Sequence, residues 1–120
     1  MLKIMELGNL TSAFVRWAKN HEKINYNKST KRLVVQGKHF DDIYEPFQQS
    51  LVLTFLDQIG ITICVAPMDS LNEWCVVVLS SNIPSKISVL YEHKDKNNVL
   101  TSRFLATKFG IEWYVNYLND

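Results

Sequence analysis

Several ingredients of familiar protein classes are scarce in this chain of 120 residues. Two cysteines cannot form the disulfide framework that holds many small secreted domains together. The four glycines are isolated, so the chain has no glycine-rich loop to cradle a phosphate. No apolar run approaches the roughly 20 residues that span a bilayer, and residues 1–10 lack the apolar core of a signal peptide. We therefore expect a cytoplasmic protein without a membrane segment.

Charge of one sign is equally scarce, because 13 basic and 12 acidic residues leave a formal net charge of +1. Such a chain has no overall field to attract nucleic acid or an anionic membrane. His21, His39 and His93 stand singly, and no pair of them has the spacing of metal ligands. We expect no metal, no cofactor, no membrane partner and no strong affinity for nucleic acid.

Hydrophobic residues are plentiful, at 47% against 21% charged, as in ordinary globular proteins. A chain of this length favours one domain over residues 1–120. Helical spacing alternates with period-two spacing along it. We predict an α+β fold with a mainly antiparallel sheet of about four or five strands, a long central helix, and terminal helices packed on the sheet.

Residues 61–81 form the most apolar stretch, and they predict a hairpin with strands at 61–66 and 74–79. Pro67 should end the first strand because it cannot donate to the ladder. A loop over 68–71 places Cys64 opposite Cys75. The same register puts six large apolar side chains on one face. They are Ile61, Ile63, Val65, Trp74, Val76 and Val78.

Residues 41–59 predict the longest helix, with regular structure beginning near Pro46 and ending at Gly60. An apolar stripe runs along it at helical spacing. The stripe consists of Tyr44, Phe47, Leu51, Phe55 and Ile59. Since the hairpin follows at once, we expect this helix to fold back and cover the hairpin's apolar face.

The remaining segments are shorter, and so are the residue patterns that predict their structure. Before the long helix, we expect a strand or lead-in over 2–7, a helix over 11–23 and a hairpin over 24–37. After the apolar hairpin, we expect a turn over 80–85, a third strand over 86–92, a helix or strand over 99–109, and a helix over 111–118. Ile87, Val89 and Tyr91 should point inward from the third strand. Gly110 should separate the last two segments.

The last segment carries the clearest candidates for a binding surface. Ile111, Tyr114, Val115 and Leu118 share one helical face, whereas Trp113 and Tyr117 point away from it, beside Glu112 and Asn116. Two large aromatics on that side have two explanations. They either cover another part of the same domain, such as the first helix, or anchor a partner protein.

Two other clusters suggest chemistry. Lys28, Lys31 and Arg32 form the one basic cluster, which is either a solvated turn or a phosphate contact. His39 lies just before Asp41, Asp42 and Glu45. These residues form either the start of a helix or an acid–base group.

The cysteines complete the candidates for chemistry. Cys64 and Cys75 should be reduced, buried and inert, because they lie in the middle of apolar strands. That placement also argues against a cysteine–histidine nucleophile.

These residues resemble no protein family closely enough to name one. A small, nearly neutral domain of this kind is typical of proteins that bind another protein, such as bacterial toxin-neutralising immunity proteins and phage-encoded inhibitors. We therefore predict a non-catalytic protein-binding module that neutralises or inhibits a partner. The alternatives are a small enzyme using His39 with the nearby carboxylates, or a weak nucleic-acid binder through Lys28, Lys31 and Arg32.

Overall fold

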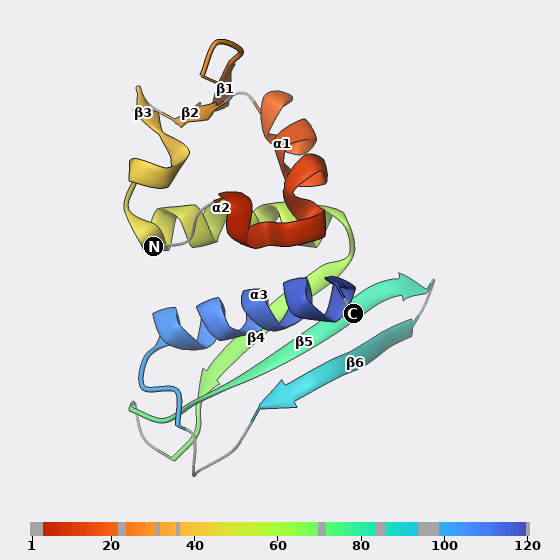
Figure 1. Cartoon of the computed structure of the whole chain (residues 1–120). Coiled ribbons are helices and arrows are strands. Elements are labelled where there is room, and N and C mark those ends of the chain that lie inside the picture. Colours follow the sequence, from red (N-terminus) through yellow and green to blue (C-terminus); the bar gives the residue numbers. More distant parts are fainter. Residues whose placement is uncertain are drawn as a thin grey trace.

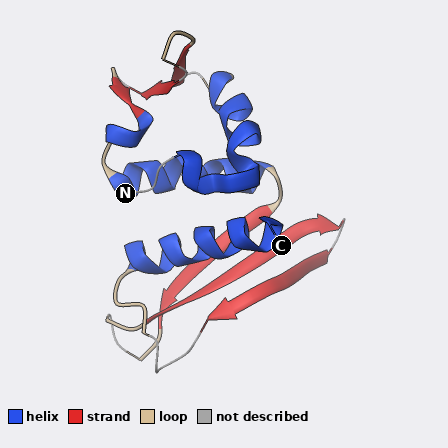
Figure 2. Ribbon diagram, in the orientation of Figure 1, coloured by secondary structure: helices blue, strands red, loops and turns tan. Residues whose placement is uncertain are grey.

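The computed structural model describes residues 4–21, 24–30, 32–35, 37–69, 72–83, 86–93 and 99–119. Within these ranges the chain is α+β and forms two antiparallel sheets, ordered β1-β2-β3 and β4-β5-β6 (Figures 1 and 2). The helices are α1 (Thr11–Lys19), α2 (Glu45–Gln58) and α3 (Arg103–Asn119). The strands are β1 (Ile24–Asn27), β2 (Arg32–Val35), β3 (Lys38–His39), β4 (Ile61–Pro67), β5 (Trp74–Ile83) and β6 (Lys86–His93). The prediction of α+β is confirmed, but two small sheets replace the single larger one.

The first sheet and α1 form the part of the fold nearest the N-terminus. A 3₁₀ segment over Ile4–Leu10 stands where a short strand or lead-in was predicted, and it bends at Gly8, where φ is 56°. The predicted helix over 11–23 ends earlier, at Lys19. The predicted hairpin is confirmed, with Ile24 opposite Val35 and Asn27 opposite Arg32.

Helix α2 begins at Glu45 with Pro46 in its first turn, and Gly60 follows it with φ of 83°, as predicted. Part of its apolar side packs on α1. Phe55 meets the rings of Phe14 and Trp17 at centroid distances of 5.5 and 5.9 Å. The expectation that this helix covers the hairpin is therefore wrong as a whole, because α1 competes for the same apolar stripe.

The β4–β5 hairpin has its predicted apolar face but a different register. Ile61 lies opposite Ser80 and Cys64 opposite Val77, two residues from the predicted pairing. Pro67 remains paired with Trp74. An edge strand tolerates proline there, because a backbone nitrogen that faces away from the neighbouring strand makes no ladder hydrogen bond. The Met68 N–H then donates to the Glu73 carbonyl at 2.6 Å and closes the loop. A shift of two residues keeps every side chain on its predicted face.

Helix α3 covers that apolar face (Figure 1), where Val76 and Ala106 are buried together with Trp74. The Ser102 hydroxyl accepts a hydrogen bond from the Leu105 N–H at 3.1 Å and caps the helix start. Gly110 does not break the helix, contrary to prediction. It lies inside one continuous helix, against Ile63 and Val76, where the helix and the sheet come closest.

Strand β6 departs from the alternation expected of it. Tyr91 pairs with Val78, whereas Val89 pairs with Leu79, so Leu90 is an extra residue in a β-bulge. The bulge reverses the faces before it, and Ile87 and Val89 are exposed rather than inward.

The connection before β6 is shorter than predicted. Strand β5 continues through Ile83, which pairs with Lys86, so residues 80–83 are strand where a turn was predicted. Residues 84 and 85 of the predicted turn lie outside the described part of the chain.

A single cluster of buried apolar side chains joins the two sheets, and it includes Phe14, Phe55, Ile61, Val78 and Ile111. Helices α2 and α3 are also connected by a hydrogen bond of 3.0 Å from the Gln49 side-chain amide to the Phe104 carbonyl. No helix in the described ranges combines the length and the apolar character needed to cross a membrane.

Candidate functional site

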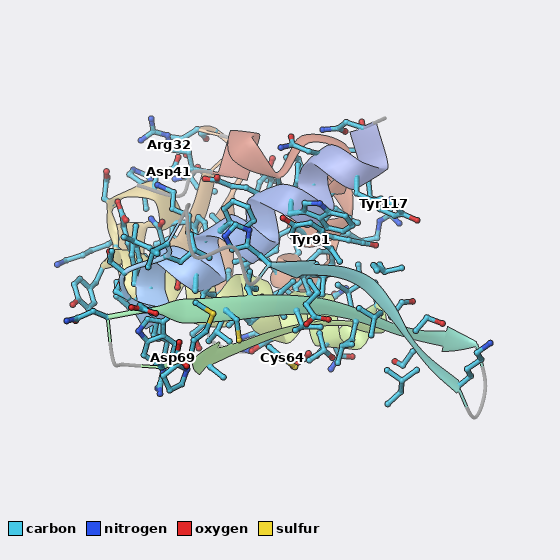
Figure 3. The ribbon with its side chains drawn as sticks, turned by 90° about the horizontal axis from the view of Figure 1, so that it is seen from below. Arg32, Asp41, Cys64, Asp69, Tyr91 and Tyr117 are labelled. Carbon is cyan, nitrogen blue, oxygen red and sulfur yellow. The ribbon has the colours of Figure 1, made fainter. Side chains whose placement is uncertain are left out.

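Five aromatic side chains line up where β6 meets α3, and we call them the aromatic row: His93, Phe109, Tyr91, Trp113 and Tyr117. Tyr91 and Trp113 stack with centroids 4.7 Å apart and ring planes 12° apart. Trp113 stacks in turn on Tyr117 at 5.1 Å and 16°. At the other end, His93 contacts Phe109 at 4.6 Å, and Phe109 stacks on Tyr91 at 6.2 Å. Figure 3 labels Tyr91 and Tyr117 on this flank.

Two periodicities produce this row. Phe109, Trp113 and Tyr117 follow one another at four-residue intervals, which keeps them on one side of α3. Tyr91 and His93 are two residues apart and therefore point to the same face of the sheet. The bulge at Leu90 lies directly before Tyr91 and directs this pair toward the helix.

Exposure increases along the row. His93 is 6% exposed, and its Nδ1 lies 3.2 Å from the Tyr91 hydroxyl, within hydrogen-bonding distance. Trp113 is half-buried, and Tyr117 at the end is 50% exposed. The row is therefore held at one end by the sheet and offers its other end to solvent.

The neighbouring residues complete the surface. Glu112 and Asn116 are exposed beside Trp113 and Tyr117, as predicted for that side of the helix. Ile111, Tyr114 and Val115 are buried on the other side, whereas Leu118 is exposed. Burial raises the pKa of Tyr114, and the neighbouring Tyr117 raises it further.

Two explanations were given for Trp113, that it covers part of its own domain or that it anchors a partner, and it has features of both. It covers part of the same domain, and the ring on which it stacks is Tyr91 of β6. Tyr117 extends the stack outward and has the greater exposure. The sequence singled out Trp113 and Tyr117 by their spacing. It did not identify Tyr91 as their support, because that contact depends on the β-bulge.

The basic cluster lies elsewhere. Lys28 and Arg32 are exposed at the β1–β2 turn, and Lys31 is outside the described residues. The Asn27 side chain accepts hydrogen bonds from the Ser29 and Thr30 N–H groups, as is usual in a tight turn. Figure 3 shows Arg32 at the opposite end of the view from Tyr117. The turn and the aromatic row therefore form separate surfaces.

His39 and its carboxylates occupy a bend between β3 and α2. A 3₁₀ turn over Phe40–Asp42 separates His39 from Glu45, and Asp42 is exposed. No hydrogen-bond partner for the buried Nδ1 of His39 is found among the described residues. Neither aspartate caps α2, because that helix begins at Glu45, after Tyr44, which makes no capping side-chain bond.

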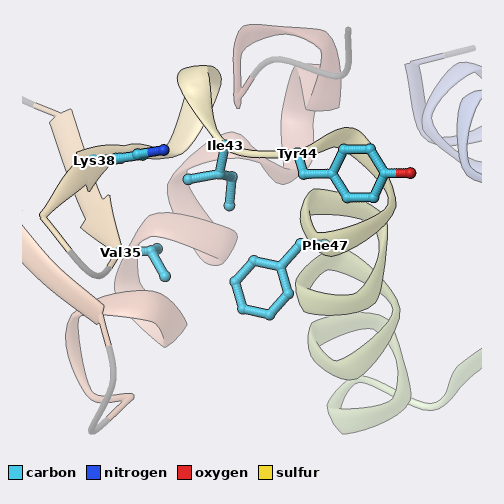
Figure 4. Close-up of a pocket in the computed structure, with 5 residues that line it drawn as sticks. All are labelled: Val35, Lys38, Ile43, Tyr44 and Phe47. Carbon is cyan, nitrogen blue, oxygen red and sulfur yellow. The ribbon is translucent and has the colours of Figure 1, made fainter.

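A shallow hollow of about 380 Å³ lies beside this bend (Figure 4). Its lining residues are Val35, Lys38, Ile43, Tyr44 and Phe47. His39 is not one of them. Tyr44 is 78% and Phe47 is 41% exposed, so their predicted packing in the core is wrong. Both lie in or just before the first turn of α2, beyond the reach of α1, and they form a mainly apolar surface feature without an acid–base pair.

The cysteines are unpaired, as predicted, but they are not buried. Cys64 is exposed and Cys75 is half-buried, because α3 covers the other face of their sheet. The described part of the chain contains no group of three or more His, Cys, Asp or Glu side chains that could hold a metal ion.

Comparisons with protein-family models, with curated proteins and with solved structures find no match to this chain.

Proposed function

We propose that the protein is a non-catalytic protein-binding module and that it binds its partner through the exposed end of the aromatic row. The observation that carries this proposal is the stack of Tyr91, Trp113 and Tyr117, which leaves Tyr117 half exposed. Trp and Tyr are enriched among the residues that dominate binding energy at protein interfaces. A surface tyrosine supported from behind by two rings is suited to that role.

Preorganisation strengthens this argument. An anchor that is already held in one conformation loses little side-chain entropy when it binds. Trp113 is restrained by Tyr91 on one side and by Tyr117 on the other, at 4.7 and 5.1 Å. Glu112 and Asn116 lie exposed around this pair and would form the polar rim that such interfaces have.

On this proposal, binding alone is enough to neutralise the partner. A module of this size inhibits a toxin or an enzyme by covering its working surface, without chemistry of its own. On this proposal the protein is of the immunity or inhibitor type.

The test compares three forms of the full chain: wild type, Tyr117→Ala and Tyr44→Ala. Tyr44 is the matched control because it is an exposed tyrosine outside the aromatic row. Each form is used to capture proteins from an extract of the native host, and any captured protein is then purified and titrated by calorimetry. We expect Tyr117→Ala to weaken binding by about 2 kcal/mol or more, as at an interface hot spot, and Tyr44→Ala to bind as wild type.

The double variant Trp113→Ala with Tyr117→Ala extends the test. It should abolish measurable binding while circular dichroism still shows the folded spectrum. A partner that binds Tyr117→Ala and the double variant with wild-type affinity would show that the aromatic row is not the binding surface.

A further inference from the structure

The face of the second sheet that points away from α3 is mostly apolar, and we call it the open face. Its members follow from the strand register and the bulge. They are Thr62, Cys64 and Ala66 on β4, Cys75, Val77 and Leu79 on β5, and Ile87, Val89 and Glu92 on β6. Ile87 is 68% and Val89 is 59% exposed, and no described element packs over them. Figures 1 and 2 show α3 on the other face only.

We propose that the open face binds the open face of a second copy of this chain. The largest apolar patch on a monomeric protein typically covers about 300–600 Å² and often has a function. A second copy of the chain is an occupant that is present wherever the protein is. The single charged side chain assigned to this face, Glu92, lies on the outer strand, where a dimer interface has its polar rim.

The sizes of the side chains make the face complementary to itself. Small side chains occupy the end near the β4–β5 loop, where Ala66 lies opposite Cys75. Larger ones occupy the other end, where Leu79 lies opposite Val89 and Ile87 follows. A two-fold axis that crosses the strands reverses their direction in the second copy. The large end of each copy then packs into the small end of the other.

The available area indicates how stable such a dimer would be. Three strands at about 4.8 Å spacing and a length of about 25–30 Å give a flat face of roughly 400 Å². Two copies therefore bury at least roughly 800 Å² together, before side-chain relief and rim contacts are added, against about 1,200–2,000 Å² for standard interfaces. We expect a dimer that dissociates on dilution.

This inference is independent of the proposed binding function. The bulge at Leu90 sends Tyr91 and Val89 to opposite faces of β6, so the aromatic row and the open face do not overlap. A dimer formed through the open face leaves both aromatic rows accessible, and it would bind two partner molecules at once.

Sedimentation equilibrium of the full chain over a wide concentration range tests the proposal. We expect the wild-type mass to rise toward twice the 13.9 kDa of one chain. Val89→Glu places a charge in the interface and should raise the concentration of half-dissociation at least tenfold. Leu105→Glu is the matched control, because Leu105 is an exposed aliphatic residue of α3, outside the open face. It should dimerise as wild type.

Ile87→Lys is a second interface variant, in case Val89→Glu impairs folding, and circular dichroism checks both. A wild-type protein that stays monomeric up to millimolar concentration would refute the proposal, whether or not the face binds some other protein. So would folded Val89→Glu and Ile87→Lys variants that dimerise as strongly as wild type.

Discussion

Gly110 of α3 stands so close to Ile63 of β4 that a Cβ atom at residue 110 would lie 2.6 Å from the Ile63 Cγ2. The Val76 Cγ2 would be 2.8 Å away. Glycine costs a helix about 1 kcal/mol relative to alanine. The chain accepts that cost here because the missing side chain lets α3 approach the sheet.

Gly110→Ala should therefore destabilise the protein, although alanine is the better helix former. Overpacking a core typically costs about 1–3 kcal/mol, which exceeds the gain in helix propensity. Urea unfolding of wild type, Gly110→Ala, Ile63→Ala and the double variant measures this. The double variant should be less destabilised than the sum of the two single variants, because removing the Ile63 side chain relieves the closer of the two clashes. A stabilised Gly110→Ala would contradict the close approach.

Phe55→Ala should lower the free energy of unfolding by roughly 3–5 kcal/mol, the range for removal of a large buried aromatic side chain. Phe55 is 2% exposed and contacts Phe14 and Trp17. Phe47→Ala on the same helix is the control, since Phe47 is partly exposed in the shallow hollow. It should cost less than about 1 kcal/mol. Similar losses for the two variants would mean that α2 does not pack through Phe55.

Much of the local structure is predictable from the sequence because short-range chemistry determines it. The start of α2 near Pro46, its end at Gly60, and the β1–β2 hairpin are examples. The packing of the helices is less predictable. Both α2 and α3 carry enough apolar side chains to cover the β4–β5 hairpin, and the observed choice depends on α1 taking Phe55 and on Gly110 admitting α3.

The register and the bulge show a second limit. Pairing Ile61 with Val78 or with Ser80 leaves the same side chains on each face, so alternation cannot distinguish the two registers. Ile87, Val89 and Tyr91 alternate without a break in the sequence, and nothing local indicates that Leu90 interrupts their ladder. For this reason Trp113 and Tyr117 were identifiable from the sequence, whereas their contact with Tyr91 and the open face were not.

Cys64 should react with a thiol reagent much faster than Cys75 in the folded protein. Cys64 is exposed and Cys75 is half-buried, and thiol reactivity depends on access. Stopped-flow titration of wild type, Cys64→Ser and Cys75→Ser at low protein concentration assigns the two phases. The fast phase should disappear in Cys64→Ser only. Two equally slow thiols at every dilution would contradict the exposure of Cys64.

Tyr114 should make the protein less stable at alkaline pH. Burial, together with the neighbouring Tyr117, raises its pKa above the ordinary value of 10.0. The folded state therefore holds the phenol proton more tightly than the unfolded state does, and this stabilisation is complete below about pH 10, the pKa of an unperturbed tyrosine. As the pH rises through the raised pKa, the stabilisation is lost, because unfolding then releases the proton.

The comparison that isolates this effect is wild type against Tyr114→Phe, with urea unfolding measured at a series of pH values from neutral to strongly alkaline. Phenylalanine keeps the ring but has no proton to lose, and the two proteins are otherwise identical. The wild type should therefore lose stability relative to Tyr114→Phe as the pH rises through the alkaline range, and the difference should be constant below it. A difference that stays the same at every pH would show that the Tyr114 hydroxyl experiences no change of environment on folding. In that case the face of α3 that carries Tyr114 would not be packed against the rest of the molecule. The aromatic row would then lose the support that it receives from α3.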